Sequence, residues 1–324
     1  MRSIIEKVPI PTAGVALGLA ALGNLLAPYA EAAHVACGVL SALLVALLAA
    51  KIVRHPGHIR SDLQNSIQAS VSATLFMTLM QLAGYLAPVA YGAAFALWLC
   101  AVAGHFTLMG WFTARYIRRF KLSEVFPTYF ICYVGIVVAA VTSPAFGMEA
   151  FGRGVFWFGF ASYLVLLVVV TARYLKHEIP EGARPLFCIY AAPMSLSLAG
   201  YLAVTPEPNV TFVVVLATLA QVLFAVVALQ LPKFLALKFY PSYAAMTFPF
   251  VITATALGKA VAALAAAGVA IPALPVVIAL IAAETVFATI MVFYVFAHYL
   301  RFFLGAPKEA RRPAMDTAAV RVLN

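Results

Sequence analysis

Long apolar stretches follow one another along almost the whole chain, separated by short polar links. A helix needs about 20 apolar residues to cross the hydrocarbon core of a bilayer. Only 10% of the residues are charged, whereas a soluble domain carries about 25%. We therefore predict an all-α polytopic membrane protein with ten transmembrane helices. The predicted spans are 10–27, 33–53, 66–86, 89–115, 127–145, 151–174, 186–204, 209–231, 243–267 and 273–300.

The positive charges predict how these spans are oriented. Of the 21 Lys and Arg residues, all but two lie in the terminal segments or in and beside every second link. The two exceptions are Arg153 and Lys259. Cytoplasmic loops are enriched in Lys and Arg, so we expect both termini to be cytoplasmic. The other links are tight turns, which makes the architecture five helical hairpins. We predict one transmembrane domain over residues 1–305 and a short basic cytoplasmic tail over 306–324.

The odd-numbered spans differ in composition from the even-numbered spans. They are short and rich in Pro, Gly, Ser or Thr, with Pro193 in the seventh span and Pro249 in the ninth. A proline inside a helix removes a hydrogen bond and bends the helix, which membranes tolerate where neighbours or a water-filled cavity satisfy the freed carbonyl. We predict an inner ring of the five odd-numbered helices around a pore and an outer, lipid-facing ring of the Leu- and Val-rich even-numbered helices. The alternative is that the prolines reflect only the composition of membrane helices.

Composition and motifs exclude several classes of function. The net charge of +10 is explained by cytoplasmic loops that face anionic lipid, and no basic patch with interleaved aromatics predicts nucleic acid as a partner. The chain has no nucleotide-binding loop and no catalytic constellation, so we predict neither an enzyme nor a cofactor. No metal site is expected either, because the cysteines lie singly in apolar segments: Cys37, Cys100, Cys132 and Cys188.

The stretch from Tyr243 to Lys259 combines an apolar helix with a proline and a cation. Eleven residues separate Phe248 from Lys259, which places both within about 20° on one helix face and roughly 16 Å apart. A ring and a cation on one face suggest a constriction and an attractor in an anion pathway. The alternative is that Phe248 packs in an ordinary core while Lys259 extends to a lipid headgroup.

Ionisable residues inside the predicted spans are few, which makes them candidates for function. Lys259 and Glu284 are expected at similar depths on neighbouring helices, so we predict an ion pair between them. That pair either pins the hairpin or orients Lys259 in the pathway. His105 lies in a lipid-type span, and we expect a packed or interfacial histidine in preference to a proton relay.

Three stretches of the sequence resemble one family of membrane proteins. The opening IPTAGVALGLAAL is similar to the family's first helix, FPTYFICYVGIVVAAVTSP to its fifth and YAAMTFPFVITATALGK to its ninth. The family is the tellurite-resistance/dicarboxylate transporters, which include bacterial TehA-type proteins and the plant slow-type guard-cell anion channels. With ten spans in the same order, the resemblance covers essentially the whole chain.

This resemblance implies a homotrimer in the bacterial inner membrane, each subunit with its own pore. It implies a pore phenylalanine at Phe248, packed near a first-helix glycine at Gly14. The bacterial family often has a proline where this chain has Ala16, so the resemblance does not carry a kink of the first helix over to this chain.

Two functions follow from the resemblance and the residues together. The first is a gated anion channel that passes small anions and is occluded by Phe248. The second is a coupled or passive transporter of malate-like dicarboxylates or tellurite-type oxyanions. A coupled carrier usually needs a titratable group at its substrate site, and only Glu284 and His105 are candidates, which favours the channel. A membrane scaffold would leave the small-residue helices unexplained.

Overall fold

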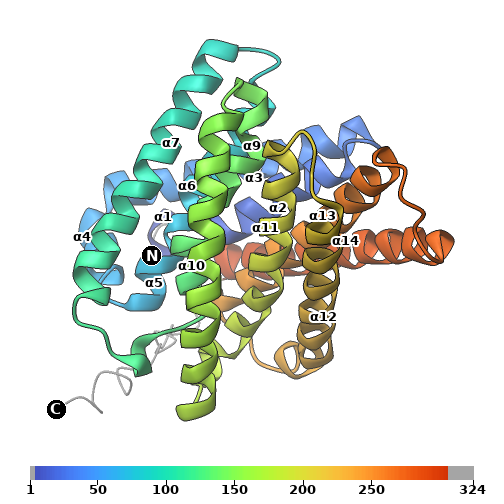
Figure 1. Ribbon diagram of the computed structural model, residues 1–324. Coiled ribbons are helices and arrows are strands. Elements are labelled where there is room, and N and C mark those ends of the chain that lie inside the picture. The colour runs from blue at the N-terminus through green and yellow to red at the C-terminus, as the bar shows by residue number, and fades with distance from the viewer. Residues whose placement is uncertain (1–3, 306–324) are drawn as a thin grey trace.

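The computed structural model describes residues 4–305, and within this range the chain is helical with no strand (Figure 1). Eight of its helical segments are long and apolar enough to cross a membrane. The other two predicted spans contain shorter apolar helices, Thr12–Leu26 and Val137–Phe146. The all-helical membrane fold is therefore confirmed, while ten complete crossings stay a prediction. The predicted tail at 306–324 lies outside the described residues.

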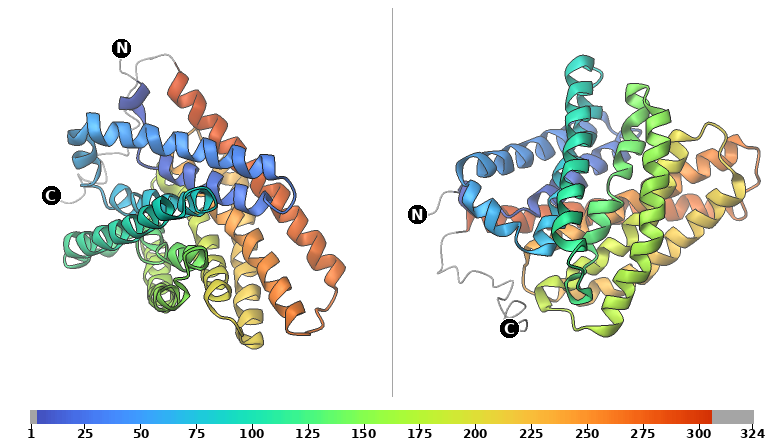
Figure 2. Two further views of the ribbon diagram at one scale, coloured as in Figure 1. Left: turned by 90° about the horizontal axis from the view of Figure 1, so that it is seen from above. Right: turned by 60° about the vertical axis from the view of Figure 1, so that its left-hand side comes forward.

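Five long helices form the outer layer of the molecule. Between 22% and 33% of their most apolar windows is buried, and their exposed side chains are mainly Val, Leu, Ile and Phe. Figure 2 shows three of them, α3, α7 and α14, along the edges of the molecule. The outer helices are α3 (Glu31–Arg54), α7 (Tyr91–Phe112), α10 (Glu149–Lys176), α12 (Val210–Leu235) and α14 (Leu274–Leu304).

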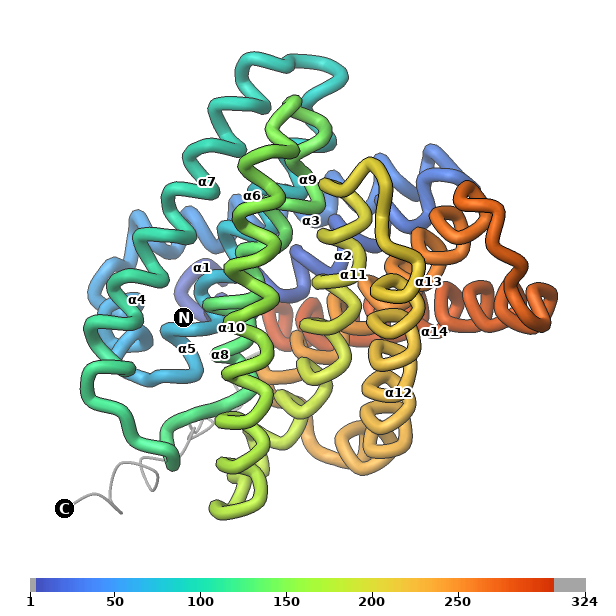
Figure 3. The backbone as a smooth tube through the Cα atoms, in the orientation of Figure 1, coloured from blue at the N-terminus to red at the C-terminus, as the bar shows by residue number. Residues whose placement is uncertain are grey.

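Five inner helices form a closed ring in which each contacts the next. The inner segment that ends at Val204 is 83% buried in its apolar window, far more than any outer helix. The alternation of inner and outer helices along the chain can be followed in Figure 3. The inner helices, in ring order, are α2 (Thr12–Leu26), α6 (Ala73–Leu86), α9 (Val137–Thr142), α11 (Ala192–Val204) and α13 (Phe248–Ala266).

Four of the inner helices are preceded by a separate short helical segment, so these spans are broken within the membrane layer. Two of these segments are 3₁₀-helical, with a tighter winding than the α-helices that follow them. The preceding segments are α5 (Ser66–Val71), α8 (Thr128–Tyr133), η4 (Glu181–Ala191) and η5 (Pro241–Met246). The remaining short segments are α1 (Ile4–Lys7), α4 (Pro56–Asp62), η1 (Thr113–Ile117), η2 (Leu122–Glu124) and η3 (Ser143–Phe146).

Hydroxyl side chains join the inner helices through backbone carbonyls. Thr247 donates to the carbonyl of Gly14 at 3.1 Å, and Thr78 donates to the carbonyl of Ala13 at 3.1 Å. Ser41, on the outer helix α3, donates to the carbonyl of Ala16 at 2.7 Å. Because water is excluded from a membrane core, polar groups there must be satisfied within the protein. Some of the Ser and Thr residues of these spans are thus explained by contacts between helices.

Candidate functional site

A cavity of about 1040 Å³ enters the inner ring from one end of the molecule. Polar and charged side chains line its mouth, including Lys7, Lys51, Asp62 and Arg301, and apolar side chains line its deeper part. We call this cavity the vestibule, and we call the end where it opens the basic end. Its mixed lining matches the usual pattern of ligand sites, which are mainly apolar with a few polar groups.

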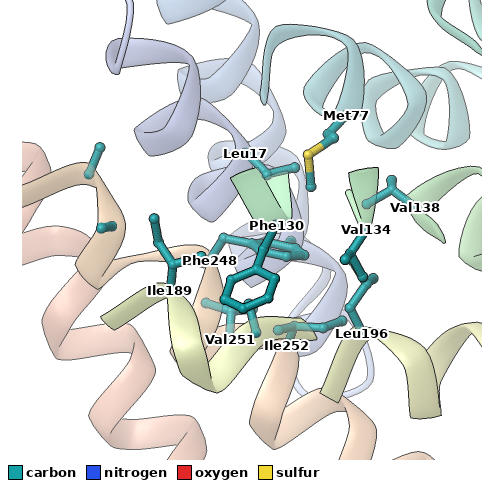
Figure 4. Close-up of a cluster of buried hydrophobic side chains, with 14 of the residues drawn as sticks. Leu17, Met77, Phe130, Val134, Val138, Ile189, Leu196, Phe248, Val251 and Ile252 are labelled. Carbon is teal, nitrogen blue, oxygen red and sulfur yellow. The ribbon is translucent and has the colours of Figure 1, made fainter. Parts of the chain in front are cut away.

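The deep part of the vestibule is an apolar floor to which every inner span contributes. Phe248, the first residue of α13, is only 6% exposed there. Figure 4 shows its ring among Leu17, Phe130 and Leu196, and Met77 of α6 lines the same cavity. The structure thus places the predicted pore phenylalanine at the inner limit of a cavity that opens at the basic end.

Gly14 and Gly18 of α2 have different neighbours. Gly14 lines the vestibule, and a Cβ added to it would lie 3.3 Å from the Cβ of Ala244. A Cβ on Gly18 would lie 2.6 Å from the Cβ of Thr247 and 3.2 Å from the backbone nitrogen of Phe248. The glycine that lets the α2 backbone approach the Phe248 position most closely is therefore Gly18, although we expected Gly14 in this role.

Pro193 and Pro249 lie at the vestibule wall, each in the first turn of an α-helix. We expected both prolines inside continuous helices that they bend. The structure differs because a 3₁₀ segment, η4 or η5, ends just before each α-helix begins. A proline in the first turn costs no helical hydrogen bond, because the amide it lacks has no intrahelical partner there. The change from 3₁₀- to α-helical winding lies at the junction between the two segments.

Lys259 and Glu284 are not brought together by the structure. Lys259 is exposed, whereas Glu284 is 2% exposed and its carboxylate faces the Gln221 side chain of α12. The predicted ion pair is therefore absent from the described part of the chain, and both side chains keep separate surroundings.

The ion pair is absent because Lys259 and Glu284 lie towards different faces of α13. Phe287, one turn after Glu284 on α14, packs against Phe250 with ring centroids 5.0 Å apart. Phe250 is about 200° around α13 from Phe248, whereas Lys259 is within about 20° of Phe248. Similar depth along the two helices was not sufficient to predict an ion pair. Glu284 lies towards the Phe250 side of α13, whereas Lys259 lies on the Phe248 side.

Lys259 continues the face of α13 that Phe248 presents to the vestibule. Towards the far end of α13, the residues that become exposed are Lys259, Ala262, Ala265 and Ala266. Lys259, Ala262 and Ala266 lie within about 40° of Phe248 around the helix, and Ala265 lies about 100° away. The exposed stripe therefore extends the Phe248 face towards the end of the molecule opposite the basic end.

His105 is completely buried on α7 and acts as a hydrogen-bonding core residue. Its Nε2 lies 2.9 Å from the carbonyl oxygen of Cys132 at the break between α8 and α9. At this break the amides of Val134 and Gly135 both donate to the carbonyl of Phe130. The helical register is interrupted there, and the imidazole N–H supplies a partner for the Cys132 carbonyl.

We expect His105→Leu to lower the stability of the protein without changing how any anion current depends on pH. The substitution leaves a buried carbonyl without a donor, which costs about 1–3 kcal/mol. Thermal denaturation followed by size-exclusion chromatography measures the first effect, and current recordings at several pH values measure the second. A pH response lost at unchanged stability would instead favour a proton-relay role.

Two features of the site were not predicted from the sequence. At the mouth, Lys51 Nζ donates to the carbonyl of Val8 at 2.6 Å and lies 3.6 Å from a carboxylate oxygen of Asp62. In the floor, Phe130 is 1% exposed beside Phe248. Its position three residues after Pro127, at the start of an inner span, is the signal that was available in the sequence.

One family of known proteins matches this chain. A comparison of the sequence with curated proteins gives no match. The model of the family described as voltage-dependent anion channel (SLAC1) matches residues 7–314, nearly the whole chain. This match agrees with the all-helical membrane fold and with the apolar outer helices. The chain belongs to the voltage-dependent anion channel (SLAC1) family.

Proposed function

We propose that this protein is a gated anion channel in which Phe248 occludes a passage through the inner ring. Membership of the family makes the chain a multi-pass membrane protein of an anion-transporting kind. The observation that carries the finer proposal is the position of Phe248 at the floor of the vestibule, nearly enclosed by apolar side chains. An apolar constriction excludes water and therefore blocks ions until it widens.

The lining of the vestibule favours a channel over a coupled carrier. A carrier that couples transport to protons needs a titratable group at its substrate site. The charged residues of the vestibule lie at its mouth, whereas the floor is made of residues such as Leu17, Phe130 and Phe248. The two buried groups considered for coupling, Glu284 and His105, are not part of this lining.

The alternative is a coupled or passive transporter of dicarboxylates or tellurite-type oxyanions. Lys51 and Arg301 at the mouth of the vestibule would attract such anions as well as chloride. Recording from the purified protein in planar bilayers, with one anion replaced by another on one side, separates the two functions. A channel gives a current that reverses at the potential set by the permeant anion, whereas an electroneutral carrier gives flux without current.

Lys259→Met is expected to lower anion current in a Phe248→Ala background by about half or more. A cation on the pathway raises the local anion concentration, and this effect is screened as ionic strength rises. The loss should therefore be largest at low salt. Lys233→Met, at the exposed end of α12, is the matched control. Equal currents in the Lys259 variant and its parent at low salt would remove Lys259 from the pathway.

The assembly and orientation are part of the same proposal. The resemblance supports a homotrimer with one pore in each subunit, a bacterial inner-membrane location and both termini in the cytoplasm. The concentration of Lys and Arg at the basic end supports the orientation. Native mass determination in detergent tests the trimer, and labelling of single cysteines from either side of the membrane tests the orientation.

A further inference from the structure

The side of the inner ring beyond Phe248 carries a pair of amide side chains between α2 and α6. Asn24 Nδ2 donates a hydrogen bond of 2.7 Å to Gln81 Oε1. Gln81 is 5% exposed, an unusual environment for an amide in an apolar layer. The bond occupies the Gln81 oxygen, which leaves the Gln81 amino group as the donor still available.

That donor is not fully enclosed by the protein. No residue in the described part of the chain accepts a hydrogen bond from Gln81 Nε2, and this nitrogen is not among the fully enclosed atoms that lack a partner. A buried amide whose donor has no protein partner carries a cost unless water or a ligand accepts from it. The Gln81 side chain is therefore prepared to bind an acceptor that the protein does not supply.

The helical positions of these residues place them on the passage side of their helices. Gln81 follows the vestibule residues Thr74 and Met77 by seven and four residues, and Asn24 follows the vestibule residue Leu17 by seven. Seven residues return a helix to within about 20° of the same face. The amide pair therefore continues the faces that line the vestibule, on the far side of Phe248.

Lys259 of α13 lies at a comparable level along the axis of the inner ring. Gly18 of α2 is level with Phe248, because a Cβ on Gly18 would contact the Phe248 nitrogen. Asn24 lies about 9 Å beyond Gly18, and Lys259 lies about 16 Å beyond Phe248 at 1.5 Å per residue. The difference, roughly 7 Å, is within the reach of a lysine side chain that folds back along its helix.

We propose that the Asn24–Gln81 amide pair and Lys259 form a second anion site, beyond Phe248 and open to the end opposite the vestibule. The site takes a small inorganic anion such as chloride or nitrate, held by the Gln81 N–H and the lysine charge. This inference rests on the proposed anion passage, for which it names a binding step. Conduction needs sites that bind well enough to admit an ion and weakly enough to release it, and a neutral amide donor with one cation meets this condition.

Binding is measured without current by ³⁵Cl NMR of the purified protein, in which bound chloride broadens the solution resonance. We expect a saturable broadening that weakens about tenfold in apparent affinity in Gln81→Leu, because a hydrogen bond to a charged group is lost. Lys259→Met should also weaken it. Gln230→Leu, on the outer helix α12, is the matched control and should leave the broadening unchanged.

Conduction is measured in the Phe248→Ala background. Gln81→Leu should lower chloride current and change the nitrate-to-chloride permeability ratio, and Asn24→Ala should do so in part by releasing the Gln81 amide. Asn24 is exposed, so its variant tests the site even when the Gln81 variant does not fold.

The two proposals fail in different ways. Gln81-dependent chloride binding in a protein whose Phe248→Ala variant carries no current would support the site and overturn the channel. Current through Phe248→Ala that is unaffected by both amide variants, with unchanged chloride broadening, would overturn the site and leave the channel.

Discussion

Phe248→Ala is expected to give a folded protein whose anion current exceeds that of the parent by at least about tenfold, the factor for a barrier lowered by roughly 1.4 kcal/mol. The ring lies in the floor of the vestibule with 6% of its surface exposed. If the ring closes the passage, its removal should open the floor of this cavity. Planar-bilayer recording measures the current, and size-exclusion chromatography measures the fold.

The anion current should rise as the side chain at position 248 becomes smaller, so Phe248→Leu should conduct less than Phe248→Ala. Phe250→Ala is the matched control on the same helix, because Phe250 packs behind α13 against Phe224 and Phe287. That variant should lose about 3–5 kcal/mol of stability and gain no current. A well-folded Phe248→Ala protein as silent as the parent would remove Phe248 as the gate.

Gly18→Ala is expected to destabilise the protein strongly and to disturb the gate position. Its Cβ would lie 2.6 Å from the Cβ and 2.7 Å from the Oγ1 of Thr247. Thr247 is fully buried, and its hydroxyl donates to the carbonyl of Gly14, so it cannot move aside cheaply. Overpacking of this kind costs about 1–3 kcal/mol, measured as a lower midpoint of thermal denaturation.

Gly14→Ala provides the comparison, since its Cβ would meet Ala244 at 3.3 Å and needs only a small adjustment. We expect a smaller loss of stability there than at Gly18. The opposite order, with Gly14→Ala the more harmful, would restore Gly14 to the role that the family resemblance implies and would contradict the contacts of α2.

The arrangement of the helices was largely predictable from the sequence. The spacing of apolar stretches indicated the spanning segments, and the contrast between proline- and serine-rich spans and Leu- and Val-rich spans indicated which were inside. Both patterns arise because side chains must match either lipid or a packed interior. The first and fifth spans were predicted less well, since α2 and α9 are shorter than a membrane core requires.

The details of the site depended on information that periodicity does not contain. The distance of Lys259 and Glu284 from their shared turn predicted how deep each residue lies but not the direction of its side chain. The two side chains lie on different sides of α13. A proline predicts a local break but not whether the preceding residues are α- or 3₁₀-helical, so Pro193 and Pro249 were placed correctly along the chain but in the wrong local structure. Periodicity could not show that Gly18, and not Gly14, comes closest to the Phe248 position, because this depends on the contact between helices.

The N-terminal ends of the inner helices have an electrostatic consequence. Four inner helices place a first-turn residue in the vestibule wall: Gly14 of α2, Thr74 of α6, Pro193 of α11 and Pro249 of α13. Each helix macrodipole carries about half a positive charge at its N-terminus, and all four ends are directed at one cavity in an apolar layer where screening is weak. We expect these N-terminal ends to contribute to a preference for negative ions, together with the cationic side chains at the mouth of the vestibule. In the proposed channel, side chains such as Lys259 and Gln81 would then tune how fast anions pass and which anions are preferred.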